Sequence, residues 1–232
     1  MTSGISTARL AMVLYLTAAL APPCSAAPSE ALPTSANASI GVDAGQLVAA
    51  LKRDAPARTA YTEVKFSNLF ERPLILRGEL EYLGPGRLGK RVDSPYQEQT
   101  TIANGQASVQ RGEAQPRHFD LSRAPGLDGF LRGFAALLGG DAAALRQDFT
   151  LSTDGDTAHW RLTLKPRDRG MARRVKAIEV DGSGNAARCF RTREADDDTS
   201  VLLVGALAES KLPSRPTPGA IAMLCRGGDA AQ

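Results

Sequence analysis

The 232-residue sequence has few of the residues on which metal and thiol chemistry depend. It contains two histidines, three cysteines and one tryptophan, and it lacks CxxC, HExxH and GxSxG motifs. These motifs are typical of redox centres, zinc proteases and α/β-hydrolases. His118 and His159 lie in strand-like segments without suitably spaced partners, so we interpret both as surface residues. We therefore expect no catalytic centre, no metal site and no cofactor.

Two partial motifs do not fit their usual structural context. Residues 84–89 match GxGxxG, but a phosphate-binding loop of this kind must lead into a helix. A strand-like run, residues 88–92, follows instead, which predicts a hairpin turn. The acidic run 196–198 lacks the spacing of an EF-hand calcium loop, so we interpret it as a solvated hairpin tip.

Long apolar runs are also scarce, and the clearest one lies near the start of the chain. Residues 10–21 are apolar, follow an arginine, and precede the small residues 25–27. A membrane-spanning helix needs about 20 apolar residues, whereas a short run with these flanks is typical of a secretory signal peptide. We predict that residues 1–27 are a cleaved signal peptide and that the protein is periplasmic. The alternatives are a membrane anchor and a lipoprotein acylated at Cys24, although two prolines directly before this cysteine disfavour acylation.

Charge is nearly balanced, with 28 basic and 25 acidic residues and no concentrated basic stripe, so we expect no nucleic-acid partner. Residues 28–42 are predicted to be a flexible lead-in, residues 43–207 one domain, and residues 208–232 an irregular, proline-rich tail. Cys189 and Cys225 remain after signal cleavage. An even pair in an oxidising compartment predicts a disulfide that ties the tail to the domain; two buried free thiols are the alternative.

Most of the remaining chain alternates between apolar and polar residues, as in residues 60–67 and 160–165, with Asn-Gly and Asp-Gly turns between such segments. This pattern predicts antiparallel strands joined by hairpins. Asp43 is suited to cap a short helix. Residues 125–138 instead place apolar side chains on one face of a helix. That helix either fills the core or forms a mobile lid over an apolar cavity, and Gly129 and Gly133, which weaken it, favour the lid.

The order of these segments, over residues 45–207, resembles the LolA family of periplasmic lipoprotein carriers. The motifs that carry the resemblance are Gly78–Tyr82 followed by Pro85, Asn104-Gly105-Gln106, the helix 130–138 with Gly140-Asp141, the strand 157–166, and the strand 175–180 with its turn 181–185. The lipoprotein carriers have an arginine directly before the proline, where this sequence has Gly84, and the nearest arginine is Arg87. The sequence therefore resembles most the divergent LolA-related group.

The resemblance implies a mainly β, α+β fold, in which an incomplete antiparallel β-barrel carries a helical lid over its concave face. It also implies a monomeric, non-catalytic carrier that ferries the acyl chains of lipoprotein or another lipid from an inner-membrane exporter to an outer-membrane acceptor. Residue by residue, the implied lipid-binding positions are Phe66, Leu80, Tyr82, Trp160, Leu162 and Leu164 in the cavity wall, and Phe130, Phe134 and Leu137 in the lid. The rival hypotheses are an adaptor with a filled core that binds a protein partner, and an enzyme with a polar cluster in the hollow.

The predicted pairing of Cys189 with Cys225 gives the first test. Thiol titration of the denatured, unreduced mature protein should detect no free thiol, because both cysteines are oxidised. Two titratable thiols per chain would contradict the pairing.

Overall fold

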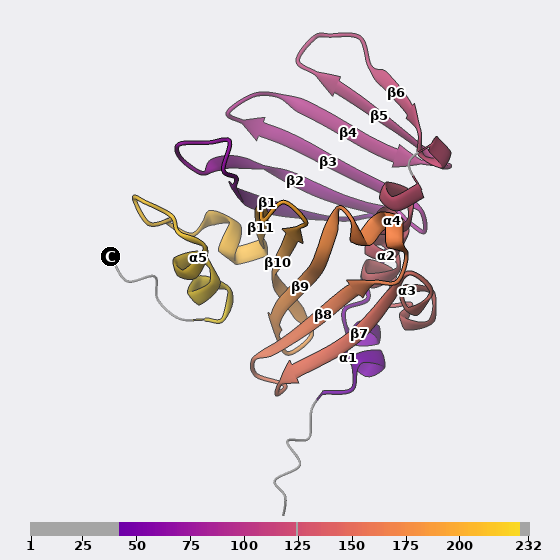
Figure 1. Cartoon of the computed structure of the whole chain (residues 1–232), viewed down its shortest axis with the longest axis vertical. Helices are drawn as coiled ribbons and strands as arrows, with labels where there is room; N and C mark the ends of the chain where they lie inside the picture. The colour runs from indigo at the N-terminus through magenta and orange to yellow at the C-terminus, as the bar shows by residue number, and fades with distance from the viewer. Residues whose placement is uncertain (1–41, 124, 228–232) are drawn as a thin grey trace, which may run out of the picture. The chain divides into compact units, whose positions relative to one another are not determined.

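The computed structural model describes residues 42–123 and 125–227, apart from the side chains of residues 125–127 and 130. In this part of the chain, eleven antiparallel strands form one sheet in the order β6-β5-β4-β3-β2-β1-β11-β10-β9-β8-β7 (Figure 1). Strands β6 and β7 end the order at opposite edges, so the sheet does not close. The expected mainly β fold with an incompletely closed antiparallel sheet is therefore confirmed.

The sheet consists of two meanders that meet at the β1–β11 pair. The first meander contains β1 (Ala57–Phe66), β2 (Leu74–Gly84), β3 (Arg87–Ser94), β4 (Glu98–Ala103), β5 (Gln106–Arg111) and β6 (Arg117–Asp120). The second contains β7 (Phe149–Gly155), β8 (Trp160–Pro166), β9 (Val175–Ser183), β10 (Ala186–Glu194) and β11 (Thr199–Val204). The helical segments are α1 (Ala44–Ala50), η1 (Leu121–Arg123), α2 (Pro125–Gly139), α3 (Ala142–Asp148), α4 (Arg169–Ala172), η2 (Gly205–Glu209) and α5 (Pro218–Cys225).

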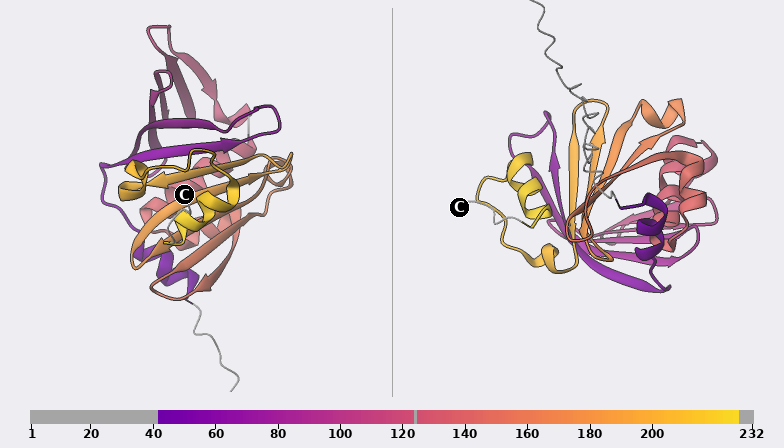
Figure 2. Two further views of the ribbon diagram at one scale, coloured as in Figure 1. Left: turned by 90° about the vertical axis from the view of Figure 1, so that its left-hand side faces the viewer. Right: turned by 90° about the horizontal axis from the view of Figure 1, so that it is seen from below.

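Helices cover the sheet on both sides (Figure 2). We call the side that packs against α1, α2 and α3 the inner face, and the side that packs against α5 and η2 the outer face. Side chains alternate between the two faces along each strand. On β1, Tyr61 belongs to the inner-face cluster and Val64 to the outer-face cluster, and they are 1% and 0% exposed. Strands at the middle of the sheet therefore bury both of their faces.

The inner face of the second meander is a filled core. Trp160, Leu162 and Leu164 are at most 3% exposed and share a cluster with Leu47 and Val48 of α1. The Trp160 indole lies so close to Gly182 that any side chain there would overlap it, and its Nε1 donates a hydrogen bond to the Gly184 carbonyl at 2.9 Å. This half of the sheet therefore forms a rigid base.

Local sequence signals position several of these elements as expected. Asp43 caps α1 by accepting a hydrogen bond from the Gln46 N–H at 2.8 Å. Asn104 and Gly105 both adopt positive φ, at 53° and 72°, in the two-residue turn between β4 and β5. The acidic run 196–198 lies at the β10–β11 hairpin tip, and the GxGxxG match lies at the β2–β3 hairpin.

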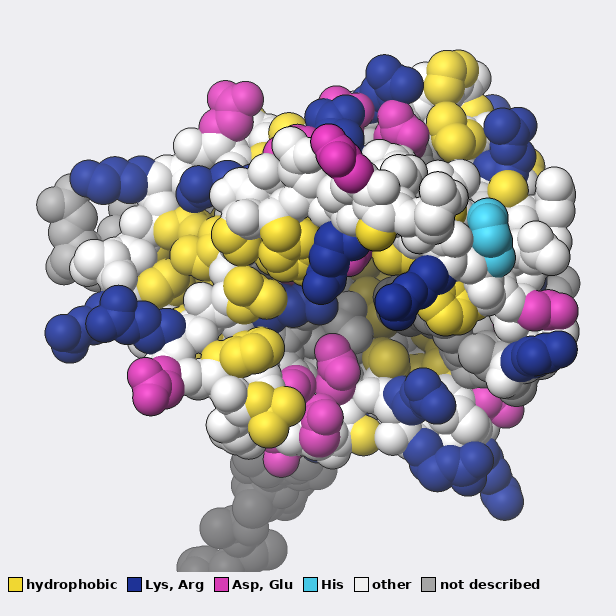
Figure 3. Space-filling view, turned by 90° about the horizontal axis from the view of Figure 1, so that it is seen from above, with side chains coloured by type: hydrophobic (Ala, Val, Ile, Leu, Met, Phe, Trp, Pro, Cys, Tyr) yellow, Lys and Arg dark blue, Asp and Glu magenta, His cyan; other side chains and the backbone are white. Residues whose placement is uncertain are grey.

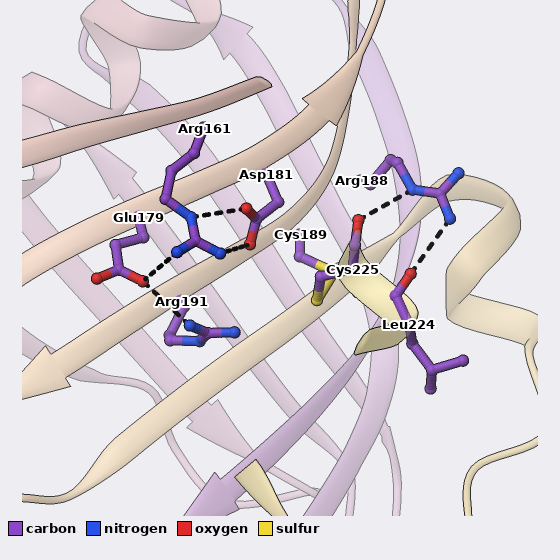
Figure 4. Close-up of a disulfide and its surroundings, with 8 residues drawn as sticks. All are labelled: Arg161, Glu179, Asp181, Arg188, Cys189, Arg191, Leu224 and Cys225. Carbon is purple, nitrogen blue, oxygen red and sulfur yellow. Dashed lines mark hydrogen bonds and ion pairs between the residues drawn. A yellow bond between two sulfur atoms is a disulfide. The ribbon is translucent and has the colours of Figure 1, made fainter. Parts of the chain in front are cut away.

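Two expected turns lie elsewhere. Asp154 and Gly155 end β7, and the loop to β8 follows them. Asp181 was expected in a turn but lies within β9, is 3% exposed, and accepts a hydrogen bond from Arg161 Nε at 2.8 Å (Figure 4). The arginine compensates the buried carboxylate, and the turn itself follows at residues 184–185.

The tail is less irregular than its prolines indicate, since it contains α5. Thr217 caps this helix and Pro218 occupies its first turn, where the missing N–H is tolerated. Cys225 at its end forms the expected disulfide with Cys189, and Arg188 donates hydrogen bonds to the Cys225 and Leu224 carbonyls at 3.1 and 3.2 Å (Figure 4). Closing a loop of this length stabilises the fold by about 3–4 kcal/mol in the chain-entropy model.

The glycines of α2 have a structural reason different from the one expected. A methyl group on Gly133 would overlap the ring of Phe149, which is fully buried. A methyl group on Gly129 would lie 2.7 Å from Cε of Met171. Close packing therefore accounts for these glycines, which give no support of their own to a lid.

This close approach generates a stability prediction. Gly133→Ala should lower the free energy of unfolding by about 1–3 kcal/mol, because the overpacked Phe149 has no space to move. This loss occurs even though Ala favours a helix over Gly by about 1 kcal/mol. Urea denaturation would measure the change. Gly219→Ala in α5, where nothing lies within 4 Å of the added carbon, is the matched control and should not destabilise; equal effects at both sites would contradict the packing explanation.

Candidate functional site on the inner face

Helix α2 spans the middle of the inner face. Phe134 packs edge to face with Phe190 of β10 at a ring-centroid distance of 5.2 Å, and Leu137 is 2% exposed. On the other side of α2, Ala135 packs with Tyr82 of β2 and Leu88 of β3. The helix therefore rests on both meanders at once.

Beyond Leu88, the inner face continues with little cover. One row of paired residues runs outward from Tyr82 through Leu88, Ile102 and Ala107 to Phe119 on the edge strand β6. Tyr82, Leu88 and the small Ala107 are each 7% exposed, Ile102 is half-buried, and Phe119 at the edge is 52% exposed. Seen from above, the surface is hollowed near its centre, with hydrophobic side chains beside the hollow among charged ones (Figure 3).

A pocket of about 290 Å³ opens where α2 meets this row. Its apolar lining comes from Leu88, Ile102, Leu121 and Leu131. Its polar lining includes Arg87, Asp128 and Arg132. This volume is at the lower end of the range of about 300–1,000 Å³ for small-molecule sites, and a mostly apolar lining with a few polar groups is typical of such sites.

Polar contacts attach α2 to its neighbouring helices and loops. Arg132 pairs with Asp128 within the helix and with Asp148 of α3 at 3.2 Å, and it is well exposed. The Arg53 N–H donates a hydrogen bond to the Leu138 carbonyl at 2.9 Å. Within the described part of the chain, no hydrogen bond joins α2 to the sheet, and mainly apolar side chains pack between them. Such contacts are non-directional, so α2 can shift on the sheet without breaking hydrogen bonds to it.

A charged cluster surrounds the buried Glu63 on the inner face. Glu63 of β1 is 3% exposed, accepts a hydrogen bond from the Ser200 hydroxyl at 2.6 Å, and pairs with Lys90 Nζ at 2.6 Å and with Lys65 Nζ at 3.6 Å. Burial acts to raise the pKa of Glu63, but the two ammonium groups and the hydrogen bonds from Lys90 and Ser200 outweigh it and hold this pKa below its usual value. Burial, with a smaller effect from Glu63, raises the pKa of the neighbouring Tyr61 hydroxyl.

The structure distributes the expected lipid-binding residues over three places. Leu80 and Tyr82 lie on the inner face of β2, and Phe134 and Leu137 of α2 pack against that face. The second group, in the filled core of the second meander, consists of Trp160, Leu162 and Leu164. Phe66 lies on the outer face with Val64 and Cys189, which corrects its assignment to the cavity wall. The side chain of Phe130 lies outside the described part of the structure.

The residues that the sequence interpretation missed are the polar cluster and the pocket lining. Glu63 lies two residues after Tyr61 on β1, so the alternation assigned it to the polar side of that strand. The sequence signal that could have indicated the cluster was an acidic residue within a strand predicted to be half-buried. His118 and His159 are both exposed. No group of three or more metal-binding side chains occurs among the described residues, and none of their helices is long and apolar enough to cross a membrane.

A family model described as "Outer membrane lipoprotein carrier protein LolA-like" matches residues 36–228. The chain belongs to this LolA-like family. The match extends through α5, so the tail of this LolA-like protein is part of the family domain. No curated protein matches the sequence.

Solved structures similar to this LolA-like chain are distant. A LolA superfamily protein of Nitrosomonas europaea is 10% identical, with 72% of this chain and 92% of that chain covered and a TM-score of 0.40. A DUF1329 family protein of Desulfovibrio piger is 10% identical, with 73% and 93% covered and a TM-score of 0.38. LprF of Mycobacterium bovis is 11% identical, with 75% and 96% covered and a TM-score of 0.33.

The buried Glu63 generates a prediction about pH and stability. Because its pKa is lowered in the folded state, its contribution is present at pH values above the unfolded value of about 4.5 and is lost as the pH falls through the folded value. Glu63→Gln should therefore destabilise the protein by about 1–3 kcal/mol at pH 7 and by less at pH 3, where part of the contribution of the carboxylate is lost. Urea denaturation at the two pH values would measure this.

The control for this experiment is Asp197→Asn, which removes a carboxylate paired with Lys176 on the exposed β10–β11 tip. Exposed pairs contribute little, so this variant should match the wild type at both pH values. A Glu63→Gln effect that is the same at pH 3 and pH 7 would show that packing rather than charge is responsible.

Proposed function

We propose that this LolA-like protein is a periplasmic carrier that binds the acyl chains of a lipoprotein or another lipid on its inner face and ferries them from the inner to the outer membrane. The observation that carries the proposal is the inner face itself. It is filled over the second meander and partly uncovered over the first, where a pocket opens between α2, η1 and the β2–β3 and β4–β5 hairpins. Membership of the LolA-like family, whose carriers are generally non-catalytic, supports the same conclusion.

Acyl chains enter beside α2 in this proposal. The apolar row from Leu88 to Ile102 lies in the pocket at the edge of the helix, and each methylene buried there contributes about 0.8 kcal/mol. Because mainly apolar side chains pack between α2 and the sheet, a bound acyl chain can replace these contacts with apolar contacts of its own. The filled core beneath Phe190 keeps its shape while α2 shifts.

The lipid-binding residues fall into two groups in this proposal. Leu80, Tyr82, Phe134 and Leu137 contact the chain directly once α2 has moved, and Leu88, Ile102 and Leu131 line the entrance. The family resemblance adds Phe130 to the lid. In the filled core of the second meander, Trp160, Leu162 and Leu164 form the wall that limits how far the acyl chain can enter.

The domain assignment and the cellular location belong to the same proposal. Residues 1–27 direct export and residues 28–42 are a lead-in, and all of them except Val42 lie outside the described part of the chain. The Cys189–Cys225 disulfide suits an oxidising compartment such as the periplasm. A carrier there exchanges cargo with an inner-membrane exporter and an outer-membrane acceptor, and it acts by binding alone as a monomer.

One observation favours a second candidate, a non-catalytic adaptor that binds a protein partner. The core beneath α1 and α3 is densely filled, and Leu145 and Phe149 of that region are fully buried. An adaptor needs no space for a ligand, so direct measurement of acyl binding separates the two functions.

The experiment is a titration of the mature protein with cis-parinaric acid, whose fluorescence increases in an apolar site. The wild type should bind it, and Leu131→Gln should weaken binding about tenfold or more, because it places an amide in the apolar entrance. Leu69→Gln is the matched control: Leu69 is 88% exposed on the β1–β2 loop, so this variant should bind like the wild type.

Two outcomes would contradict the carrier function. If the folded wild type gives no saturable fluorescence with cis-parinaric acid, the adaptor becomes the better proposal. If Leu131→Gln and Leu69→Gln bind equally well, acyl chains bind at a site other than the entrance beside α2.

A further inference from the structure

The hydroxyl of Tyr61 is a buried polar group without a partner. Tyr61 is 1% exposed in the inner-face core, and its hydroxyl has no hydrogen bond among the described residues. A buried hydroxyl that has lost its bond to water destabilises the fold, so such groups are rare and each needs an explanation. Phe would fill the same space, so packing alone does not explain why a hydroxyl is buried here.

Lys90 places a positive charge beside the same ring. Its Nζ lies 5.2 Å from the Tyr61 ring centroid and 2.6 Å from Glu63 Oε2, so the carboxylate holds the ammonium group in position. An ammonium group has three N–H donors and no acceptor. The side chain of Lys90 is 32% exposed, so it is less enclosed than Glu63 at 4%.

The cluster offers hydrogen-bond donors that its own members do not use up. Lys90 and Lys65 both pair with Glu63, and the carboxylates of Glu194, Asp93 and Glu98 also act on groups of this cluster. Tyr61 and Lys90 can both donate hydrogen bonds here. The group that would complete them is an oxygen acceptor.

The cluster is close to the proposed acyl-binding row. Lys90 pairs with Leu80 of β2 and lies two residues from Leu88 on the same face of β3. This spacing corresponds to about 7 Å along the strand. A chain whose polar end lies at Lys90 can therefore run past Leu80 and Tyr82 toward the pocket beside α2.

We propose that Tyr61 and Lys90 bind the oxygen-bearing end of the acyl cargo, with the Tyr61 hydroxyl and the Lys90 ammonium group both donating hydrogen bonds to it. The acceptor is either the carboxylate of a fatty acid or the ester carbonyl of an acyl lipid. Glu63 is a positioning residue that orients Lys90. This inference rests on the proposed carrier function and adds to it a polar subsite that selects cargo.

The test uses the mature protein and two probes, cis-parinaric acid and its methyl ester. Tyr61→Phe keeps the ring and removes only the hydroxyl, and it should weaken binding of cis-parinaric acid about tenfold or more, the effect of losing a hydrogen bond to a charged group. The same variant should keep or raise the midpoint of thermal unfolding, because it removes an unpartnered buried group. Lower affinity with undiminished stability is a combination that a purely structural role would not produce.

A second variant removes the charged pair together. Glu63→Gln/Lys90→Met avoids leaving a buried carboxylate without its partner, and it should also weaken binding of cis-parinaric acid. Lys165→Met changes an exposed lysine on β8 and is the matched control, which should bind like the wild type.

The two probes distinguish the sources of the acceptor. Weaker binding of the acid alone identifies a carboxylate, and weaker binding of both probes identifies the carbonyl oxygen that they share. Tyr61→Phe that binds both probes as tightly as the wild type would overturn the subsite while leaving the carrier function intact. Failure of the wild type to bind either probe would instead refute the carrier function, and the subsite with it.

Discussion

The fold depends on one constraint, which is that the strands at the middle of the sheet must be buried on both faces. Tyr61 and Val64 point to opposite sides of β1, and neither is exposed. Helices α1, α2 and α3 meet this requirement on the inner face, and α5 with its disulfide meets it on the outer face. Both layers of helices therefore follow from the position of β1 and β11 at the centre of the sheet.

Burial decreases from this centre toward the β6 edge, and the candidate site lies where it becomes incomplete. The filled second meander resembles the core of any stable domain, whereas the first meander leaves apolar side chains such as Ile102 and Phe119 partly uncovered. Among the described residues, Glu63, Lys90, Lys65 and Ser200 form a cluster of ion pairs and hydrogen bonds on the same face. The pocket, the partly uncovered apolar row and the charged cluster therefore share one face of the sheet, and in the described structure no hydrogen bond joins α2 to that sheet.

Much of this arrangement could be predicted from the sequence, because local patterns determine it. The alternation of apolar and polar residues predicted strands, Asn104-Gly105 predicted a hairpin, and the apolar stripe of residues 125–138 predicted α2. The errors concern relations between distant residues. Alternation places Phe66 on the same face as Val64, but it does not tell which face packs against α2. Gly133 is required by the nearby ring of Phe149, a contact between distant residues that no local pattern contains. The charged cluster was missed for the same reason, since Glu63 and Lys90 come from different strands.

The pairing of β1 with β11 has a consequence for how the chain acquires its structure. Each meander is built from neighbours in sequence, but Tyr61 pairs with Val204 across most of the domain. Contacts between residues so far apart form slowly, because a long loop must close before they provide any stabilisation. A chain threaded across a membrane from its N-terminus would therefore hold β1 as an unpaired edge until β11 emerged. During that interval the first meander is the part of the molecule most exposed to aggregation and most in need of protection by chaperones.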